Sequence, residues 1–182
     1  RSGHLPPPLQ MADGLSRNRP KTARTIEGCC LSHGRRGFVQ VADDFPEEVR
    51  RVLESVREIY RFEAITKNQG LDPEARLRFH QTHSQPVMES LKEWLDEQIE
   101  GNRVEPNGNL GGAIEFMRRR WGPLTLFLRE PGAPLDNNIC EQSLKMAILH
   151  RKNSLGFKTQ HGAQVGDLFM SLIQTCRLNR VN

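Results

Sequence analysis

Several features that mark particular protein classes are missing from this sequence of 182 residues. No stretch approaches the roughly 20 apolar residues that a membrane-spanning helix needs, and no charged, apolar and small-residue series marks a signal peptide. The four cysteines form no Cys-x-x-Cys pair, so the sequence indicates neither a zinc knuckle nor a disulfide framework. We therefore expect a soluble cytoplasmic protein with no membrane partner.

One metal-binding alternative remains among the cysteines. Cys30 and His33 are spaced so that they can share a metal ion, but the sequence has no second pair to complete such a site. Small buried side chains are the better interpretation of this pair.

The net charge is only +4, but the charged residues are unevenly distributed along the sequence. Residues 1–40 carry seven Lys and Arg against two Asp and Glu, residues 41–100 carry eight against 14, and residues 101–182 carry 11 against six. A polyanionic partner should therefore meet the two basic ends, because phosphate contacts supply most non-specific affinity and the acidic middle repels such a partner.

The sequence pattern predicts short strands near the beginning and helices from residue 45 onward. Residues 9–12 are a short apolar run that ends at Asp13-Gly14, which predicts a strand leading into a turn. Residues 26–31 predict a second strand, followed by a helix over residues 33–38. An Asp-Gly turn also accounts for Asp13 without any function.

Apolar residues then recur at helical spacing. Pro46 suits the first turn of one helix and Pro73 that of a second, in which Pro86 is expected to break or kink the helix. Residues 101–112 indicate a turn-rich linker, and Ile114, Met117 and Trp121 mark a further helix. Its polar face carries Arg118 to Arg120, either as a solvated face or as phosphate contacts.

A polar motif follows at Asp136-Asn137-Asn138-Ile139-Cys140-Glu141. Asp136 or an adjacent Asn can cap a helix that begins near Ile139, which places Glu141 in the first turn, where a carboxylate is favoured. The basic run Arg151-Lys152 lies less than three turns later. The alternative is that Glu141 simply pairs with Lys145 and that Asp136 is only a cap.

Blocks along nearly the whole chain resemble the C-terminal half of the bacterial insertion sequence 66 family of DDE transposases. In order, they are Trp121-Gly122-Pro123-Leu124, Phe127-Leu128, Asp136 to Glu141, Arg151-Lys152-Asn153 and Ser171 to Cys176. Upstream, Ala12-Asp13-Gly14 and Cys30 to Arg36 with Phe38 are similar to further blocks of that family.

The resemblance implies an α+β, mostly helical fold with a partial ribonuclease H-like sheet. We expect residues 1–44 to belong to the catalytic core, residues 45–121 to be a helical insertion, and residues 122–182 to complete the core. Asp13 and Glu141 are then the second and third catalytic and metal-ligating carboxylates, binding Mg²⁺ or Mn²⁺. The chain begins with Arg1 and reads as an excerpt, so the first Asp is expected upstream and the fragment alone is expected to be inactive.

The resemblance also implies DNA as the partner: the terminal inverted repeats of a mobile element and a target DNA. A homo-oligomer on DNA, accessory proteins and association with the bacterial nucleoid follow from the same resemblance. The DNA-binding candidates are Arg35, Arg36, Asn137, Asn138, Lys145, Arg151, Lys152 and Lys158.

Two departures from the family pattern support a second interpretation. Gln142 stands where the family usually has a basic residue, and Gly156 interrupts the block after Asn153. The alternative function is a non-catalytic DNA-binding remnant or a degenerate transposase copy.

Overall fold

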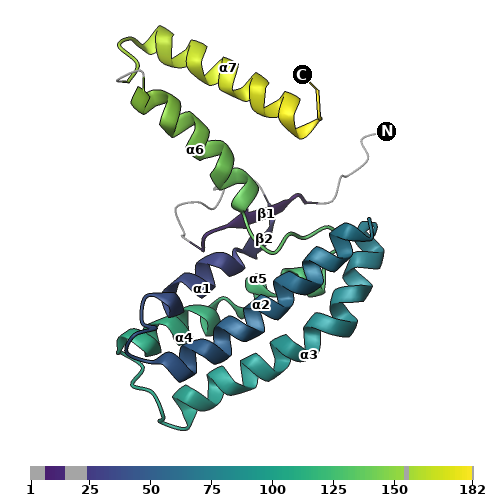
Figure 1. Ribbon diagram of the computed structural model, residues 1–182, viewed down its shortest axis with the longest axis vertical. Coiled ribbons are helices and arrows are strands. Elements are labelled where there is room, and N and C mark those ends of the chain that lie inside the picture. Colours follow the sequence, from purple (N-terminus) through teal and green to yellow (C-terminus); the bar gives the residue numbers. More distant parts are fainter. Residues whose placement is uncertain (1–6, 15–23, 154–155, 182) are drawn as a thin grey trace. The chain divides into compact units, whose positions relative to one another are not determined.

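A computed structural model describes residues 7–14, 24–153 and 156–181 (Figure 1). These residues form two compact units, divided between Asp136 and Asn137. The first unit contains a two-stranded sheet and most of the helices, and the second contains two helices. The expectation of a mostly helical α+β fold is confirmed, whereas the ribonuclease H-like relation of the sheet stays a prediction.

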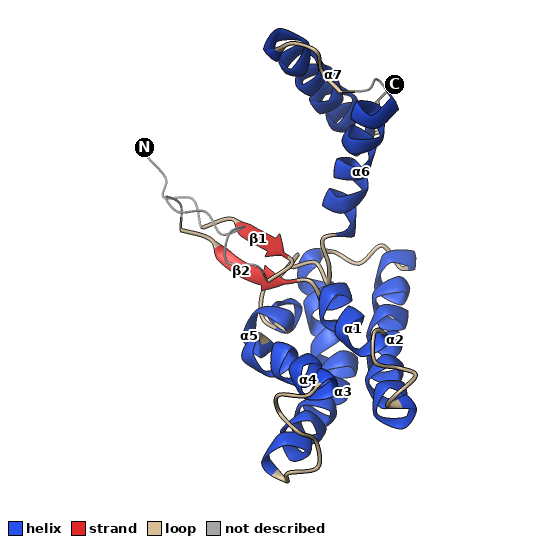
Figure 2. Ribbon diagram, turned by 90° about the vertical axis from the view of Figure 1, so that its left-hand side faces the viewer, coloured by secondary structure: helices blue, strands red, loops and turns tan. Residues whose placement is uncertain are grey.

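Two short parallel strands open the first unit. β1 (Leu9–Ala12) pairs with β2 (Ile26–Cys29), with Leu9 opposite Ile26 and Ala12 opposite Cys29. Both strands end at the same edge, next to α5 (Figure 2). The second strand is shorter than predicted because Cys30 already caps α1 (Leu31–Val39). The two strands and the helix after them are thus confirmed.

The longest helices are α2 (Pro46–Asn68) and α3 (Pro73–Glu100), which pack against each other. α3 begins as predicted, with Pro73 in its first turn and the Asp72 side chain accepting a hydrogen bond from Ala75 N at 2.7 Å. Pro86 lies inside the helix and does not break it. The helix continues because its buried face runs on both sides of the proline, so packing against α2 offsets the lost backbone hydrogen bond.

The next helix begins earlier than predicted. α4 (Asn109–Arg119) includes residues that we expected in a linker, and Trp121 starts the separate short helix α5 (Trp121–Leu124), followed by the 3-10 turn η2 (Leu126–Leu128). The start of α4 was predicted as a linker because Gly111 and Gly112 lie in its first turn. Gly111 is required there because a Cβ at this position would lie 2.1 Å from the carbonyl oxygen of Glu105.

The core of the first unit lies between α1, α2, α3, α4 and η2. α1 packs against α2 and α4, and η2 packs against α3. The largest fully buried side chains are those of Phe38, Phe127, Leu31, Ile59, Met88, Leu91, Leu95, Leu110, Ile114, Met117, Leu124 and His80. The expected ranges 1–44, 45–121 and 122–182 concern the organisation of a catalytic core, and they stay a prediction.

The second unit consists of α6 (Asn138–Asn153) and α7 (Gln160–Leu178). Thr159 caps α7 by accepting a hydrogen bond from Gly162 N at 3.0 Å. Neither helix has a buried residue, and the apolar stripe that the sequence places on α7 is exposed at Leu168, Phe169, Leu172 and Ile173. Within the described ranges, no helix combines the length and the apolar character needed to cross a membrane.

Candidate functional site

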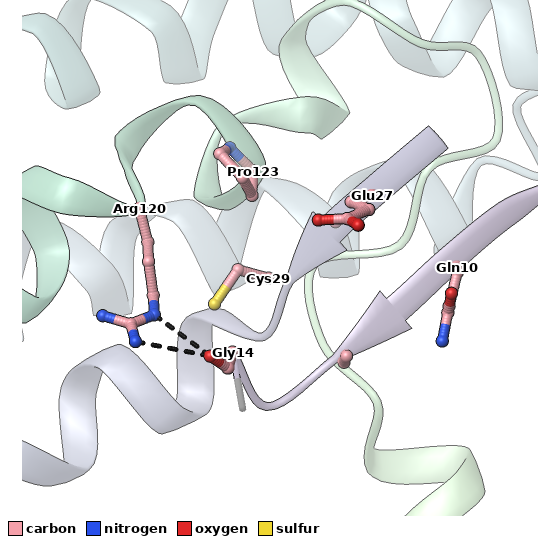
Figure 3. A pocket seen from close by; sticks show the side chains of 8 residues that line it. Gln10, Gly14, Glu27, Cys29, Arg120 and Pro123 are labelled. Carbon is pink, nitrogen blue, oxygen red and sulfur yellow. Dashed lines mark hydrogen bonds between the residues drawn. The ribbon is translucent and has the colours of Figure 1, made fainter. Parts of the chain in front are cut away.

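Asp13 directly follows β1 at the edge where both strands end, as the sequence predicts. The backbone after it is held by Arg120, whose Nε and Nη2 donate to the carbonyl oxygen of Gly14 at 3.4 and 3.3 Å (Figure 3). Gly14 has a φ of +87°, and a Cβ here would lie 2.8 Å from Arg120 Nε. The Asp13-Gly14 turn therefore needs its glycine both for conformation and for the close approach of Arg120.

The arginines at the end of α4 contact different parts of the first unit. Arg118 donates to Asp96, Glu100 and Glu115 at 2.6 to 2.7 Å, so it joins α4 to α3. Arg120 instead reaches the strand edge and stacks over the Phe116 ring at 4.1 Å. No local pattern links Arg120 to the edge that carries Asp13, because 106 positions separate Arg120 from Gly14.

The cysteines near this edge are buried. Burial raises the pKa of the Cys29 thiol to about 11, although the nearby Arg120 guanidinium acts in the opposite direction. Asp13 is also close enough to raise this pKa. Cys29 is therefore a neutral thiol near pH 7, and Cys30 has none of its surface exposed, in agreement with the packing role that we expected for Cys30.

A small cavity opens beside β1 and β2 at this edge. It is lined by Gln10, Ala12, Gly14, Glu27, Gly28, Cys29, Arg120 and Pro123 (Figure 3). Glu27 is a carboxylate in the lining of this cavity for which the sequence predicts no role, because a single Glu inside a short strand carries no motif. Among the described residues, no group of three or more His, Cys, Asp or Glu is arranged to hold a metal ion.

Glu141 lies in the first turn of α6, as predicted. Its backbone N donates to the carbonyl oxygen of Asn137 at 3.0 Å, so the helical hydrogen bonds begin at the Asn pair of the motif. A carboxylate in this turn is stabilised by the positive end of the helix dipole. Asp13 and Glu141 belong to different units, and their convergence on one metal ion stays a prediction.

The candidate DNA-binding cations are exposed on both units, whereas Asn137 is half-buried and its Oδ1 is buried. Arg35 and Arg36 are exposed on α1 in the first unit. The second unit carries Asn137 and Asn138 at the start of α6, exposed Lys145, Arg151 and Lys152 along it, and exposed Lys158 before α7. Lys145, Arg151 and Lys152 thus lie on one helix, α6, while their contact with DNA stays a prediction.

Asp136 has a partner that the sequence did not suggest. Its Oδ2 accepts a hydrogen bond from the Tyr60 hydroxyl at 2.8 Å, across 76 positions. We expected Asp136 or a neighbouring Asn to cap α6, and the structure adds a contact from α2 to this residue.

A buried polar cluster joins α2 to α3 elsewhere in the first unit. Glu63 Oε2 accepts from Arg76 Nε at 2.8 Å and lies 2.9 Å from His80 Nε2, while His80 Nδ1 lies 2.7 Å from Ser84 Oγ. Burial would raise the pKa of Glu63, but the hydrogen bonds from His80 and Arg76 outweigh it and lower this pKa to about 2. His80 and Ser84 are fully buried, so this cluster stabilises the fold and offers no access to a substrate.

Comparison with known families identifies the chain. The family description "Transposase IS66 family" matches residues 11–165, which include both Asp13 and Glu141. The chain belongs to the IS66 transposase family. The match confirms the resemblance inferred from the sequence blocks.

Relatives of this IS66-family chain occur in Sinorhizobium fredii. A protein described as uncharacterized protein y4hP is 30% identical over 164 residues, covering 84% of this chain and 29% of the relative. Uncharacterized protein y4jD is 30% identical over 151 residues, covering 82% and 29%, and uncharacterized protein y4qI is 26% identical over 172 residues, covering 92% and 31%. The chain therefore spans less than a third of the length of these relatives. No solved structure matches the chain.

Proposed function

We propose that this chain is part of a transposase that cleaves and joins DNA strands by a metal-dependent DDE mechanism. Asp13 and Glu141 supply two of the three acidic residues, and the first Asp is expected upstream, as the family resemblance implies. The observation that supports this most strongly is local. Within the matched range, Asp13 follows a strand at the carboxyl edge of a parallel pair, and Glu141 occupies the first turn of a helix.

The donor set fits a hard divalent cation. Carboxylate oxygens are preferred ligands of Mg²⁺, and Mn²⁺ accepts them equally well. When bound, such ions activate the attacking oxygen and stabilise the leaving oxygen during phosphoryl transfer. Arg120 fixes the chain after Asp13 by holding the Gly14 carbonyl oxygen, and the helix start fixes the backbone of Glu141.

DNA binding is assigned to the basic residues of both units. Arg35 and Arg36 are proposed to contact the backbone from α1, and Lys145, Arg151 and Lys152 from α6. Lys158 extends this strip, and Asn137 and Asn138 orient the start of α6 or the substrate. The DNA partners are the inverted-repeat ends and the target, bound by a homo-oligomer in the bacterial cytoplasm.

The acidic assignment is tested in the complete polypeptide that contains this chain. Glu141→Gln keeps the size of the side chain but removes its charge, so strand cleavage with Mg²⁺ or Mn²⁺ should vanish while binding to element ends is retained. Glu93→Gln removes an exposed carboxylate of α3 and is the matched control, with cleavage expected to be unchanged.

Full cleavage by Glu141→Gln would show that Glu141 is only a helix-start residue paired with Lys145. A wild-type polypeptide that binds the ends but cleaves with neither metal ion would favour the second candidate, a DNA-binding remnant. The departures at Gln142 and Gly156 are the observations that keep this candidate in the test.

Convergence of the two carboxylates has a readout that does not depend on activity. With Fe²⁺ in place of Mg²⁺, ascorbate and peroxide produce radicals that cut the polypeptide next to the bound ion. We expect cuts near Asp13 and near Glu141, both lost in Glu141→Gln. Cuts confined to one of the two positions would contradict a shared ion.

The assignment of the basic strip is tested by salt dependence. Arg151→Ala with Lys152→Ala should weaken binding to all DNA sequences and make the log–log salt slope shallower by roughly one per lost contact. Arg57→Ala with Arg78→Ala, two exposed cations of α2 and α3, is the matched control. Equal losses in both double variants would remove the special role of the strip.

A further inference from the structure

The segment that leads from η2 to α6 is bound along its length by other elements of the first unit. Gln81 Nε2 donates to Leu128 O at 3.1 Å, and Arg76 Nη1 donates to Ala133 O at 2.9 Å. The backbone N of Leu31 donates to Leu135 O at 2.9 Å. These bonds come from α3 and α1, so residues 128–135 follow a path that the helices determine.

The last bond of this series is made by a side chain of α2. The Tyr60 hydroxyl donates to Asp136 Oδ2 at 2.8 Å and lies 2.7 Å from Ser32 Oγ. A phenol has one proton, which Tyr60 gives to the carboxylate, so Ser32 must be the donor to Tyr60. The three groups therefore form a directed chain from α1 through α2 to Asp136.

The Tyr60 phenol keeps its proton near neutral pH, so the series of hydrogen bonds from Ser32 to Asp136 is maintained. Burial raises the pKa of the Tyr60 phenol above its ordinary value of 10.0, and the hydrogen bond to Asp136 raises it further, although the bond from Ser32 acts in the opposite direction. Tyr60 is also the only tyrosine of the chain. The phenol thus remains protonated near neutral pH, and it can donate to Asp136 there.

Asp136 lies just before α6 in the sequence, so its hydrogen bond to Tyr60 bears on where that helix begins. Asp136 is the first residue of the motif that ends at Glu141, and α6 begins two residues after it, at Asn138. Two residues span at most about 7 Å of extended chain, so the point at which Asp136 is held limits where α6 can start.

We propose that Tyr60, supported by Ser32, is a positioning residue that holds Asp136 and thereby fixes the start of the helix that carries Glu141. The proposal rests on the proposed function, because it assigns Glu141 a catalytic role. It gives the helical segment 45–121 a task beyond its own packing, since Tyr60 of α2 acts on the motif from within that segment.

Tyr60→Phe is the direct test, because it removes one hydroxyl and keeps the ring. A hydrogen bond to a charged group is strong enough that its loss should lower the cleavage rate at saturating DNA by about tenfold. The affinity for element ends should change by less than about twofold, since no proposed DNA-binding group is altered. Ser32→Ala should have a smaller effect of the same kind. Ser55→Ala should have none, because the Ser55 hydroxyl of α2 donates only to Arg51 O within its own helix.

A double-variant cycle distinguishes positioning from general loss of stability. If Tyr60 acts through Asp136, Tyr60→Phe should slow cleavage much less in an Asp136→Asn background than in the wild type. Equal effects in both backgrounds would overturn the proposal, as would a Tyr60→Phe protein with the wild-type cleavage rate. All assays are run well below the unfolding midpoint of each variant.

The outcomes for the two proposals are separable. Full cleavage by Glu141→Gln would refute the catalytic assignment whatever Tyr60 does. Loss of cleavage in Glu141→Gln together with an unaffected Tyr60→Phe would leave the catalytic assignment standing and refute only the positioning role.

Discussion

Replacing Glu63 by Gln should destabilise the first unit strongly and in a pH-dependent way. The Glu63 carboxylate accepts from Arg76 and lies beside His80, and only 7% of the residue is exposed. A Gln side chain keeps the shape but presents no charge to Arg76. Removing one partner of a buried ion pair is costly because the other charge stays buried.

The pKa of Glu63 gives the magnitude and the direction with pH. Its value in the folded chain is about 2, against an ordinary value of 4.5. Because a pKa difference of one corresponds to about 1.4 kcal/mol, the charged Glu63 contributes about 3 kcal/mol to the free energy of unfolding. The folded pKa is the lower one, so this contribution is complete above the ordinary pKa. It is lost as the pH falls from 4.5 toward 2.

The assay is urea unfolding of the chain, followed by tryptophan fluorescence at several pH values. Both tryptophans, Trp94 and Trp121, belong to the first unit, so the signal reports its unfolding. At pH 7 we expect Glu63→Gln to lower the free energy of unfolding by about 3 kcal/mol relative to the wild type. The gap between the two proteins should narrow as the pH falls below 4.5.

Other carboxylates with lowered pKa values are present in both proteins, so their contributions cancel in the difference between the two free energies of unfolding. Glu93→Gln is the control and should leave the unfolding curve almost unchanged, because Glu93 is exposed. A loss below about 1 kcal/mol at pH 7, or a gap that stays constant from pH 5 to pH 3, would refute the reasoning, because a buried charged pair cannot be that weak.

Three further predictions concern the backbone, the tyrosine and the acidic segment. Gly111→Ala should lower the unfolding midpoint of the chain, because the new Cβ would lie 2.1 Å from a backbone oxygen; an unchanged midpoint in thermal unfolding would contradict this packing. Tyr60 should ionise above its ordinary pKa of 10.0 in an absorbance titration at about 295 nm, and Asp136→Asn should lower that pKa; equal curves would argue against the hydrogen bond. Glu54→Gln with Glu93→Gln should leave DNA affinity unchanged or raised, because the acidic segment is expected to face away from DNA; a clear loss of affinity in a folded protein would overturn that expectation.

The sequence by itself determined features that depend on neighbouring residues. An apolar run followed by Asp13-Gly14 predicted a strand and its end, and Pro46 and Pro73 marked the starts of the two long helices. The helix near Ile139 and the first-turn place of Glu141 were predicted for the same reason. Strand ends, helix starts and capping depend on interactions within about one turn, so neighbouring residues in the sequence can predict them.

In two places packing outweighed local preference. Pro86, which we expected to break or kink α3, lies inside a helix whose buried face continues past it, and α4 starts at Asn109, within the range predicted as a linker, despite the glycines that follow. In the second case the absence of a side chain at Gly111 is what lets the helix approach the preceding loop.

Only the tertiary structure decided which distant groups meet. Arg120 holds Gly14 across 106 positions, and Tyr60 donates to Asp136 across 76. Glu63 of α2 is buried beside His80 of α3, although a Glu in an amphipathic helix usually indicates the exposed face. Such contacts have no local signature, because they depend on how whole elements pack, and packing depends on the fit of many side chains at once.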